Sequence, residues 1–186
     1  MRIKANIVKK YEEADASEKV DIICKNYPNF IGIVDGYTEG LCYMIQNEKA
    51  YNCRQNHDEL GVRVQTSGIH SDTTAITAIN NTLIKQAIIN CDFSGDILEG
   101  VDRKEELCNT AFTLRKMRMD YELFKGQLGM LAKNESKIFL GYLSGDKNME
   151  EIALEEGIHY KSVAQKVRRI KVKIKIQMIE FLEGIA

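Results

Sequence analysis

Apolar residues recur every three or four positions along most of this chain, which is the spacing of amphipathic α-helices. Helices are predicted over four stretches before residue 129, namely residues 3–25 (as one or two short helices), 30–51, 71–90 and 102–128. Pro28 is the only proline, and it predicts a break at residues 26–29 because proline disfavours the helical conformation of the residue before it. The predicted fold class is therefore mainly α.

Two of these helices suggest how they pack. Gly32, Gly36 and Gly40 recur at four-residue spacing on one side of the helix over 30–51, and we expect a close contact with a neighbouring helix there. The helix over 71–90, capped by Ser71 or Asp72, carries four apolar residues on one expected core face: Ile76, Ile79, Leu83 and Ala87.

Two polar stretches separate the predicted helices. Residues 52–70 are predicted to form a long loop, in which Val62-Arg63-Val64 is a short extended piece. Residues 92–102 are acidic and contain two glycines, so they are predicted to form a connector.

The helix over 102–128 begins with Asp102 and Glu105, a variant of the capping box. Apolar residues then follow in alternating steps of four and three: Leu107, Ala111, Leu114, Tyr121 and Leu128. Arg118 and Lys125 interrupt this rhythm, which favours packing within the chain over a coiled coil.

From Gly129 onward, the pattern predicts shorter helices joined by glycine-containing turns. Gly145 ends one helix, and Gly157 lies in the next turn, where a positive φ is favourable for glycine. A further helix is predicted from Tyr160, so the two helices around Gly157 form a helix-turn-helix. Six residues are predicted to hold this structure: Ile152, Ala153, Gly157, Ile158, Val163 and Val167.

Residues 171–176 admit two predictions. Their strict alternation is typical of a strand, whereas the absence of a breaker after Tyr160 favours one helix to about Glu183. As a helix, the second half is apolar over a wide arc. We expect either the helix over 102–128 or a second subunit to cover that arc.

Charge separates the two helices around Gly157. The first contains four glutamates, whereas no acidic residue follows Gly157 until Glu180. Seven cations lie between them: Lys161, Lys166, Arg168, Arg169, Lys171, Lys173 and Lys175. Such a run repels itself on an ordinary surface helix but is favourable against a phosphate backbone.

Composition excludes several classes of protein. No stretch reaches the roughly 20 apolar residues that span a membrane, and the N-terminus does not resemble a signal peptide, which predicts a cytoplasmic protein without membrane contact. The five cysteines are scattered, as expected for free thiols rather than a metal site. No nucleophile elbow, phosphate loop or pair of metal ligands is present, so neither an enzyme nor a cofactor is expected.

Leu131 to Ile174 resembles region 4 of sigma-70-type factors and of sigma-like regulators from phages and prophages. The resemblance rests on Tyr142 with Gly145, the sequence Glu151-Ile152-Ala153, the Gly157-Ile158 turn and the basic pair Arg168-Arg169. It implies a helix that reads the −35 promoter element in the major groove. With the neighbouring cations of the basic run, the expected DNA contacts are Tyr160, Lys161, Ser162, Gln165, Lys166, Arg168, Arg169 and Lys171.

The expected function is sequence-specific DNA binding by a sigma-like transcription regulator. A regulator is favoured over a complete sigma factor because no aromatic-rich basic helix, of the kind that melts promoter DNA, precedes the motif. The predicted domains are an N-terminal helical region (1–101), a connecting helix (102–128) and a sigma region 4-like domain (129–186). Double-stranded DNA is the expected partner, with RNA polymerase and a second copy as further candidates. The alternative is an interaction or inhibitor module that acts through the N-terminal region.

Overall fold

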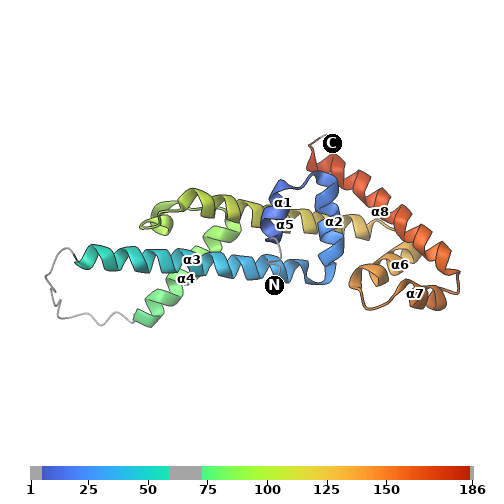
Figure 1. The fold of residues 1–186 in the computed structure, drawn as a ribbon, viewed down its shortest axis with the longest axis horizontal. Helices are drawn as coiled ribbons and strands as arrows, with labels where there is room; N and C mark the ends of the chain where they lie inside the picture. The colour runs from blue at the N-terminus through green and yellow to red at the C-terminus, as the bar shows by residue number, and fades with distance from the viewer. Residues whose placement is uncertain (1–5, 59–72, 185–186) are drawn as a thin grey trace. The chain divides into compact units, whose positions relative to one another are not determined.

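The computed structural model describes residues 6–58 and 73–184, and all regular secondary structure in these residues is helical (Figure 1). The mainly α prediction is thus confirmed. The chain divides into two compact units, of which unit 1 comprises residues 1–33 and 117–186 and unit 2 comprises residues 34–116. Two long helices continue from one unit into the other, namely α3 (Phe30–Asp58) and α5 (Lys104–Gly129).

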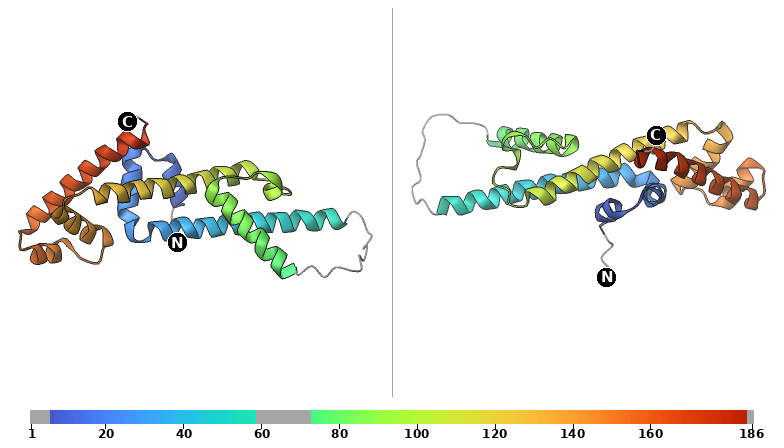
Figure 2. Two further views of the ribbon diagram at one scale, coloured as in Figure 1. Left: turned by 180° about the vertical axis from the view of Figure 1, so that it is seen from behind. Right: turned by 90° about the horizontal axis from the view of Figure 1, so that it is seen from above.

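The remaining elements belong to one unit each. Unit 1 contains α1 (Ile7–Glu13), α2 (Ala16–Asn26), η1 (Tyr27–Asn29), α6 (Lys133–Ser144), α7 (Met149–Glu156) and α8 (Tyr160–Leu182). Unit 2 contains α4 (Thr73–Asn90) and η2 (Gly95–Leu98). Figure 2 shows these helices in two further views.

The N-terminal residues form two short helices, each with a side-chain cap. The Asn6 side chain accepts a hydrogen bond from the Val8 N–H at 3.0 Å, and Asp15 accepts from the Glu18 N–H at 2.7 Å. Pro28 lies in the 3₁₀ turn η1 between α2 and α3. The predicted pair of short helices and the break after them are confirmed.

An aromatic cluster with one buried acid forms part of the core of unit 1. Phe30 stacks on Tyr121, with ring centroids 5.3 Å apart and planes 8° from parallel. The Tyr11 hydroxyl donates a hydrogen bond to Asp120 Oδ2 at 2.8 Å, and both side chains are buried. Burial and the neighbouring Asp120 carboxylate raise the pKa of Tyr11 far above its ordinary value. The phenol therefore stays protonated and fixes α1 against α5.

In unit 2, polar contacts tie the connector after α4 to α3. Lys49 Nζ donates to the Asp96 carbonyl at 2.9 Å, and Asn52 donates to the Gly100 carbonyl at 2.9 Å. Leu98 and Val101 of the same connector are buried. The acidic stretch predicted as a connector is thus an ordered segment with its own 3₁₀ turn.

Four local predictions are wrong in whole or in part. A Cβ added at Gly32, Gly36 or Gly40 would meet no described atom within 4 Å, so no close helix contact exists there. In α4, Ile79 and Leu83 are more than half exposed, whereas Ala87 is buried as predicted, together with Ile84 and Ile88. The side chain of Ile76 lies outside the described residues. Apolar residues occur on several sides of α4, so spacing alone did not select the buried face.

The third wrong prediction concerns the start of α5. The Glu48 carboxylate from α3, and not an Asp102–Glu105 pair, accepts the backbone N–H groups of Asp102 (2.8 Å) and Arg103 (3.1 Å). The fourth wrong prediction is the start of the loop 52–70, because the chain is helical up to Asp58. Its remainder, with Val62-Arg63-Val64 and the proposed caps Ser71 and Asp72, lies outside the described residues.

Candidate nucleic-acid interface

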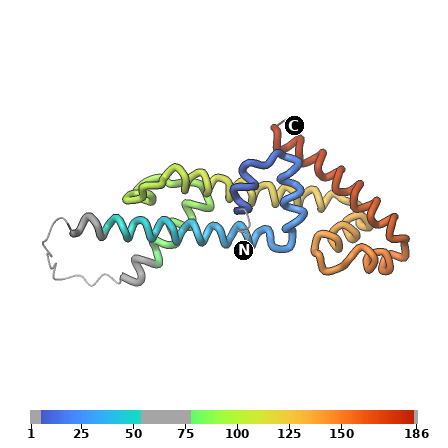
Figure 3. The backbone as a smooth tube through the Cα atoms, in the orientation of Figure 1, coloured from blue at the N-terminus to red at the C-terminus, as the bar shows by residue number. Residues whose placement is uncertain are grey.

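The last three helices, α6, α7 and α8, pack on one another and follow directly in the chain (Figure 3). Their shared core is formed by side chains that are at most 6% exposed, namely Ile138, Phe139, Leu143, Ile152, Ala153, Val163 and Val167. The residues predicted to hold a helix-turn-helix therefore lie together, except that Gly157 is exposed in the turn and Ile158 is half-buried.

Two glycines end the first two helices of this motif. Gly145 has a φ of 71° and Gly157 a φ of 63°, the left-handed conformation that glycine adopts without a Cβ clash. At the second turn, the Gly157 and Ile158 N–H groups donate to the carbonyls of Leu154 (3.3 Å) and Ala153 (3.0 Å). This is the Schellman arrangement, which satisfies helix-terminal carbonyls and directs the chain into α8.

Side-chain caps fix the starts of α7 and α8. Asn148 Oδ1 accepts from the Glu151 N–H at 2.9 Å, and the Glu151 carboxylate accepts from the Asn148 N–H at 2.8 Å. This capping box was missed from the sequence, although its Asn-x-x-Glu spacing is the signal for it. At α8, His159 Nδ1 accepts from the Lys161 N–H at 3.2 Å, so histidine performs the capping that serine or threonine usually provides.

Helix α8 is continuous over 23 residues, so the helix prediction for 171–176 is confirmed and the strand alternative is wrong. Its buried stripe consists of Val163, Val167, Ile170, Ile174 and Met178. Helix α2 packs against α8 (Figure 1). The apolar pattern in the sequence had instead indicated that the helix over 102–128 or a second subunit covers the apolar side of this helix.

The face of α8 opposite this stripe is polar and basic in its first half. With about 100° between successive residues, Lys161, Gln165 and Arg168 point away from the core side of the helix. Of the predicted DNA contacts, Tyr160 is 47% exposed, and Lys161, Ser162, Gln165, Lys166, Arg168 and Arg169 are also exposed. These seven residues occupy the first three turns of the helix, on its solvent side.

The basic run itself divides into two groups. Lys171 and Lys175 form ion pairs with Asp21 of α2, at 2.8 Å and 2.6 Å. The other five cations, Lys161, Lys166, Arg168, Arg169 and Lys173, are exposed and have no ion pair within the described part of the chain. Lys171, which was predicted to contact DNA, therefore already has an anionic partner inside unit 1.

Asp21 acts as a counterion between two lysines. Desolvation by burial favours its neutral form, but the hydrogen bonds and charges of Lys171 and Lys175 outweigh this, so the pKa of Asp21 is lowered. Lys171 responds in the opposite direction, because its contact with Asp21 outweighs its own desolvation and raises its pKa. No sequence signal identified Asp21, because it lies 150 residues before Lys171 and its partner choice depends on the fold.

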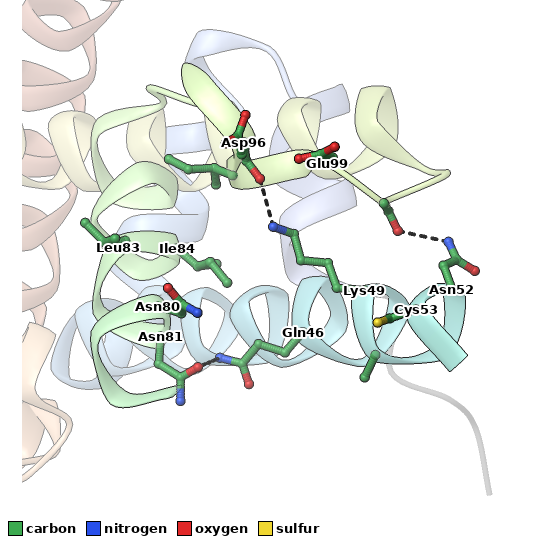
Figure 4. A pocket seen from close by; sticks show the side chains of 13 residues that line it. Gln46, Lys49, Asn52, Cys53, Asn80, Asn81, Leu83, Ile84, Asp96 and Glu99 are labelled. Atoms are coloured by element: carbon green, nitrogen blue, oxygen red, sulfur yellow. Dashed lines mark hydrogen bonds between the residues drawn. The ribbon is translucent and has the colours of Figure 1, made fainter. Parts of the chain in front are cut away.

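A hollow lies in unit 2, with a volume of about 1350 Å³ (Figure 4). Several of its polar groups are already hydrogen-bonded to each other or to backbone, as in the contact from Gln46 Nε2 to Asn81 Oδ1 at 2.7 Å. Within residues 6–58 and 73–184, no three His, Cys, Asp or Glu side chains gather as metal ligands. The α8 surface is therefore the stronger candidate for a functional site.

Among the described helices, none is long and apolar enough to span a membrane. A scan against protein-family models matched no family, and searches of curated proteins and of solved structures also found no match.

Proposed function

We propose that this protein binds double-stranded DNA through the exposed face of α8 and thereby regulates transcription. The observation that carries the proposal is the set of five exposed cations on α8 without an ion pair among the described residues. Cations that neutralise phosphates release condensed counterions, which makes such a surface favourable against DNA. The helix-turn-helix, with its side-chain caps and its turn at Gly157, supports the same proposal, because it leaves this face of α8 open to a partner.

The side chains suggest a division of roles along this face. Gln165 and Arg169 are one helical turn apart, and their side chains can make paired hydrogen bonds to adenine and guanine edges in the major groove. Lys161, Lys166 and Arg168 flank them and suit phosphate contacts, which position the protein without reading sequence. Lys171 is left out of the proposed contact set because Asp21 neutralises it.

The resemblance of residues 131–174 to sigma region 4 extends the proposal. It favours a sigma-like regulator, related to those of phages and prophages, that recognises a −35-type promoter element. On the same ground, RNA polymerase is the proposed protein partner.

The test is selection of bound fragments from a random DNA pool, followed by affinity measurement on the selected sequence. Replacing Lys166, Arg168 and Arg169 together by alanine should reduce the affinity at least tenfold, since each removes a proposed contact. The matched control replaces Lys9, Lys10 and Lys25, three exposed cations of α1 and α2, and changes the net charge equally. Equal affinities of the two triple variants would refute the proposed surface.

A second candidate function is protein binding by unit 2. Tyr43 and Tyr51 lie two turns apart on α3 and are 64% and 61% exposed. Exposed tyrosines on one helix face are typical of interaction surfaces. If this candidate holds, replacing both tyrosines by alanine should abolish capture of a partner protein while DNA affinity stays unchanged.

A further inference from the structure

Helix α7 presents an isolated apolar side chain to solvent. Leu154 is 82% exposed, the highest value for any large apolar side chain among the described residues. Two exposed glutamates lie near it on the same helix, Glu150 and Glu151, whereas Glu155 is already paired with Lys147 at 2.7 Å. The result is an apolar knob beside two acidic side chains.

Helix α8 presents the complementary feature. A shallow hollow of about 530 Å³ lies along its outer face and is lined by Gln165, Arg168, Arg169, Val172, Lys173 and Ile176. Val172 is 49% exposed and Ile176 is 56% exposed, so the floor is apolar. Its rim carries three cations that have no ion pair in the described part of the chain.

The knob and the hollow of one chain cannot meet. Helix α7 packs on the side of α8 that carries Val163 and Val167, whereas Val172 points about 160° away from its buried neighbours Ile170 and Ile174. A second copy can bring the two features together without any change within either chain.

We propose that Leu154 of one copy binds in the α8 hollow of a second copy. Glu150 and Glu151 beside Leu154 then face Arg168, Arg169 and Lys173, so opposite charges meet around a buried apolar contact. The two surfaces are different patches of the chain, which makes the contact heterologous and allows it to repeat from head to tail.

Two properties follow from this geometry. One knob in one hollow is a small contact, well below the roughly 1,000 Å² of a stable interface, so the association is weak and depends on concentration. The hollow also shares Gln165, Arg168 and Arg169 with the proposed DNA surface, so a bound second copy and DNA compete for α8.

The test measures mass by sedimentation, without DNA, for the full chain from micromolar to millimolar concentration. Leu154→Gln removes the knob and Ile176→Gln alters the hollow, and both sites are exposed, so we expect both variants to keep the fold, which circular dichroism checks. Each variant alone should remain at the mass of one chain, while the wild type grows in mass with concentration. The control Met130→Gln changes a 70% exposed residue outside both surfaces and should behave like the wild type.

The mixture of the two variants is decisive. Ile176→Gln retains the knob and Leu154→Gln retains the hollow, so together they should form a species of two chains and nothing larger. A wild type that stays at the mass of one chain, or a mixture that does, would overturn the proposal. Because DNA is absent, this result is independent of whether α8 binds DNA.

Discussion

Replacing Asp21 by asparagine isolates the charge that joins α2 to α8. The substitution keeps the size of the side chain and removes the negative charge facing Lys171 and Lys175. The Asp21 side chain is 46% exposed, and the two lysine side chains are 32% and 21% exposed, so solvent screens both ion pairs. Pairs of this kind contribute from about 0.2 to 1 kcal/mol each, and we expect a loss of about 1 kcal/mol in the free energy of unfolding.

In a chain of 186 residues, that loss corresponds to a fall of about 2–4 °C in Tm, measured by calorimetry or circular dichroism near neutral pH. Asp146→Asn is the matched control, because Asp146 is exposed in the loop after α6 and its side chain forms no ion pair with a described residue. A Tm for Asp21→Asn that is no lower than that of the control would refute the account of α2 as an electrostatic support of α8.

The same variant should show a defined dependence on pH. Because the pKa of Asp21 is lowered in the fold, its contribution is complete above the ordinary value of 3.8 and is lost as the pH falls through the folded value. The raised pKa of Lys171 matters at alkaline pH. The stability that Lys171 contributes is complete below its ordinary pKa of 10.5 and is lost as the pH rises through its pKa in the folded protein. The stability difference between wild type and variant should therefore be constant near neutrality and shrink towards acid. A difference that grows in acid would contradict this assignment.

The turn and the cap of the helix-turn-helix yield two further predictions, both measured by urea unfolding. Gly157→Ala should destabilise the protein by about 1–2 kcal/mol, because Gly157 has a φ of 63°, which a side chain disfavours. Gly141→Ala within α6 should be neutral or stabilising by up to about 1 kcal/mol, since the added Cβ would meet Ile152 at an ordinary contact distance of 3.6 Å. The reverse order of these two variants would show that the turn is not left-handed. Asn148→Ala should destabilise by about 1 kcal/mol through loss of the capping box, and an unchanged midpoint would show that the box does not form.

The sequence predicted the helices well because periodicity and helix-stop residues are local. The two short N-terminal helices, the glycine turns at Gly145 and Gly157 and the long last helix all follow from neighbours in the chain. Packing partners do not follow from neighbours. The outward direction of Ile79 and Leu83 and the replacement of a local cap by Glu48 depend on contacts between helices that no spacing encodes.

The candidate site divides in the same way. Exposure of Gln165, Arg168 and Arg169 follows from their position opposite an apolar stripe, so the pattern was sufficient. The sequence did not predict that the charge of Lys171 is unavailable to DNA, because the carboxylate that neutralises it, Asp21, lies 150 residues earlier in the chain. The basic run that looked uniform in the sequence therefore offers five cations to a partner rather than seven.

The salt dependence of DNA affinity tests the central claim most directly. If Lys161, Lys166 and Arg168 each contact a phosphate, at about 0.9 per contact, the slope of log affinity against log salt approaches about −2.7. Replacing Lys166, Arg168 and Arg169 by alanine removes two of these phosphate contacts and should make the slope shallower by about 1.8, and the Lys9, Lys10 and Lys25 control should leave it unchanged. The same slope for both triple variants, or no binding by the wild type at low salt, would contradict the account.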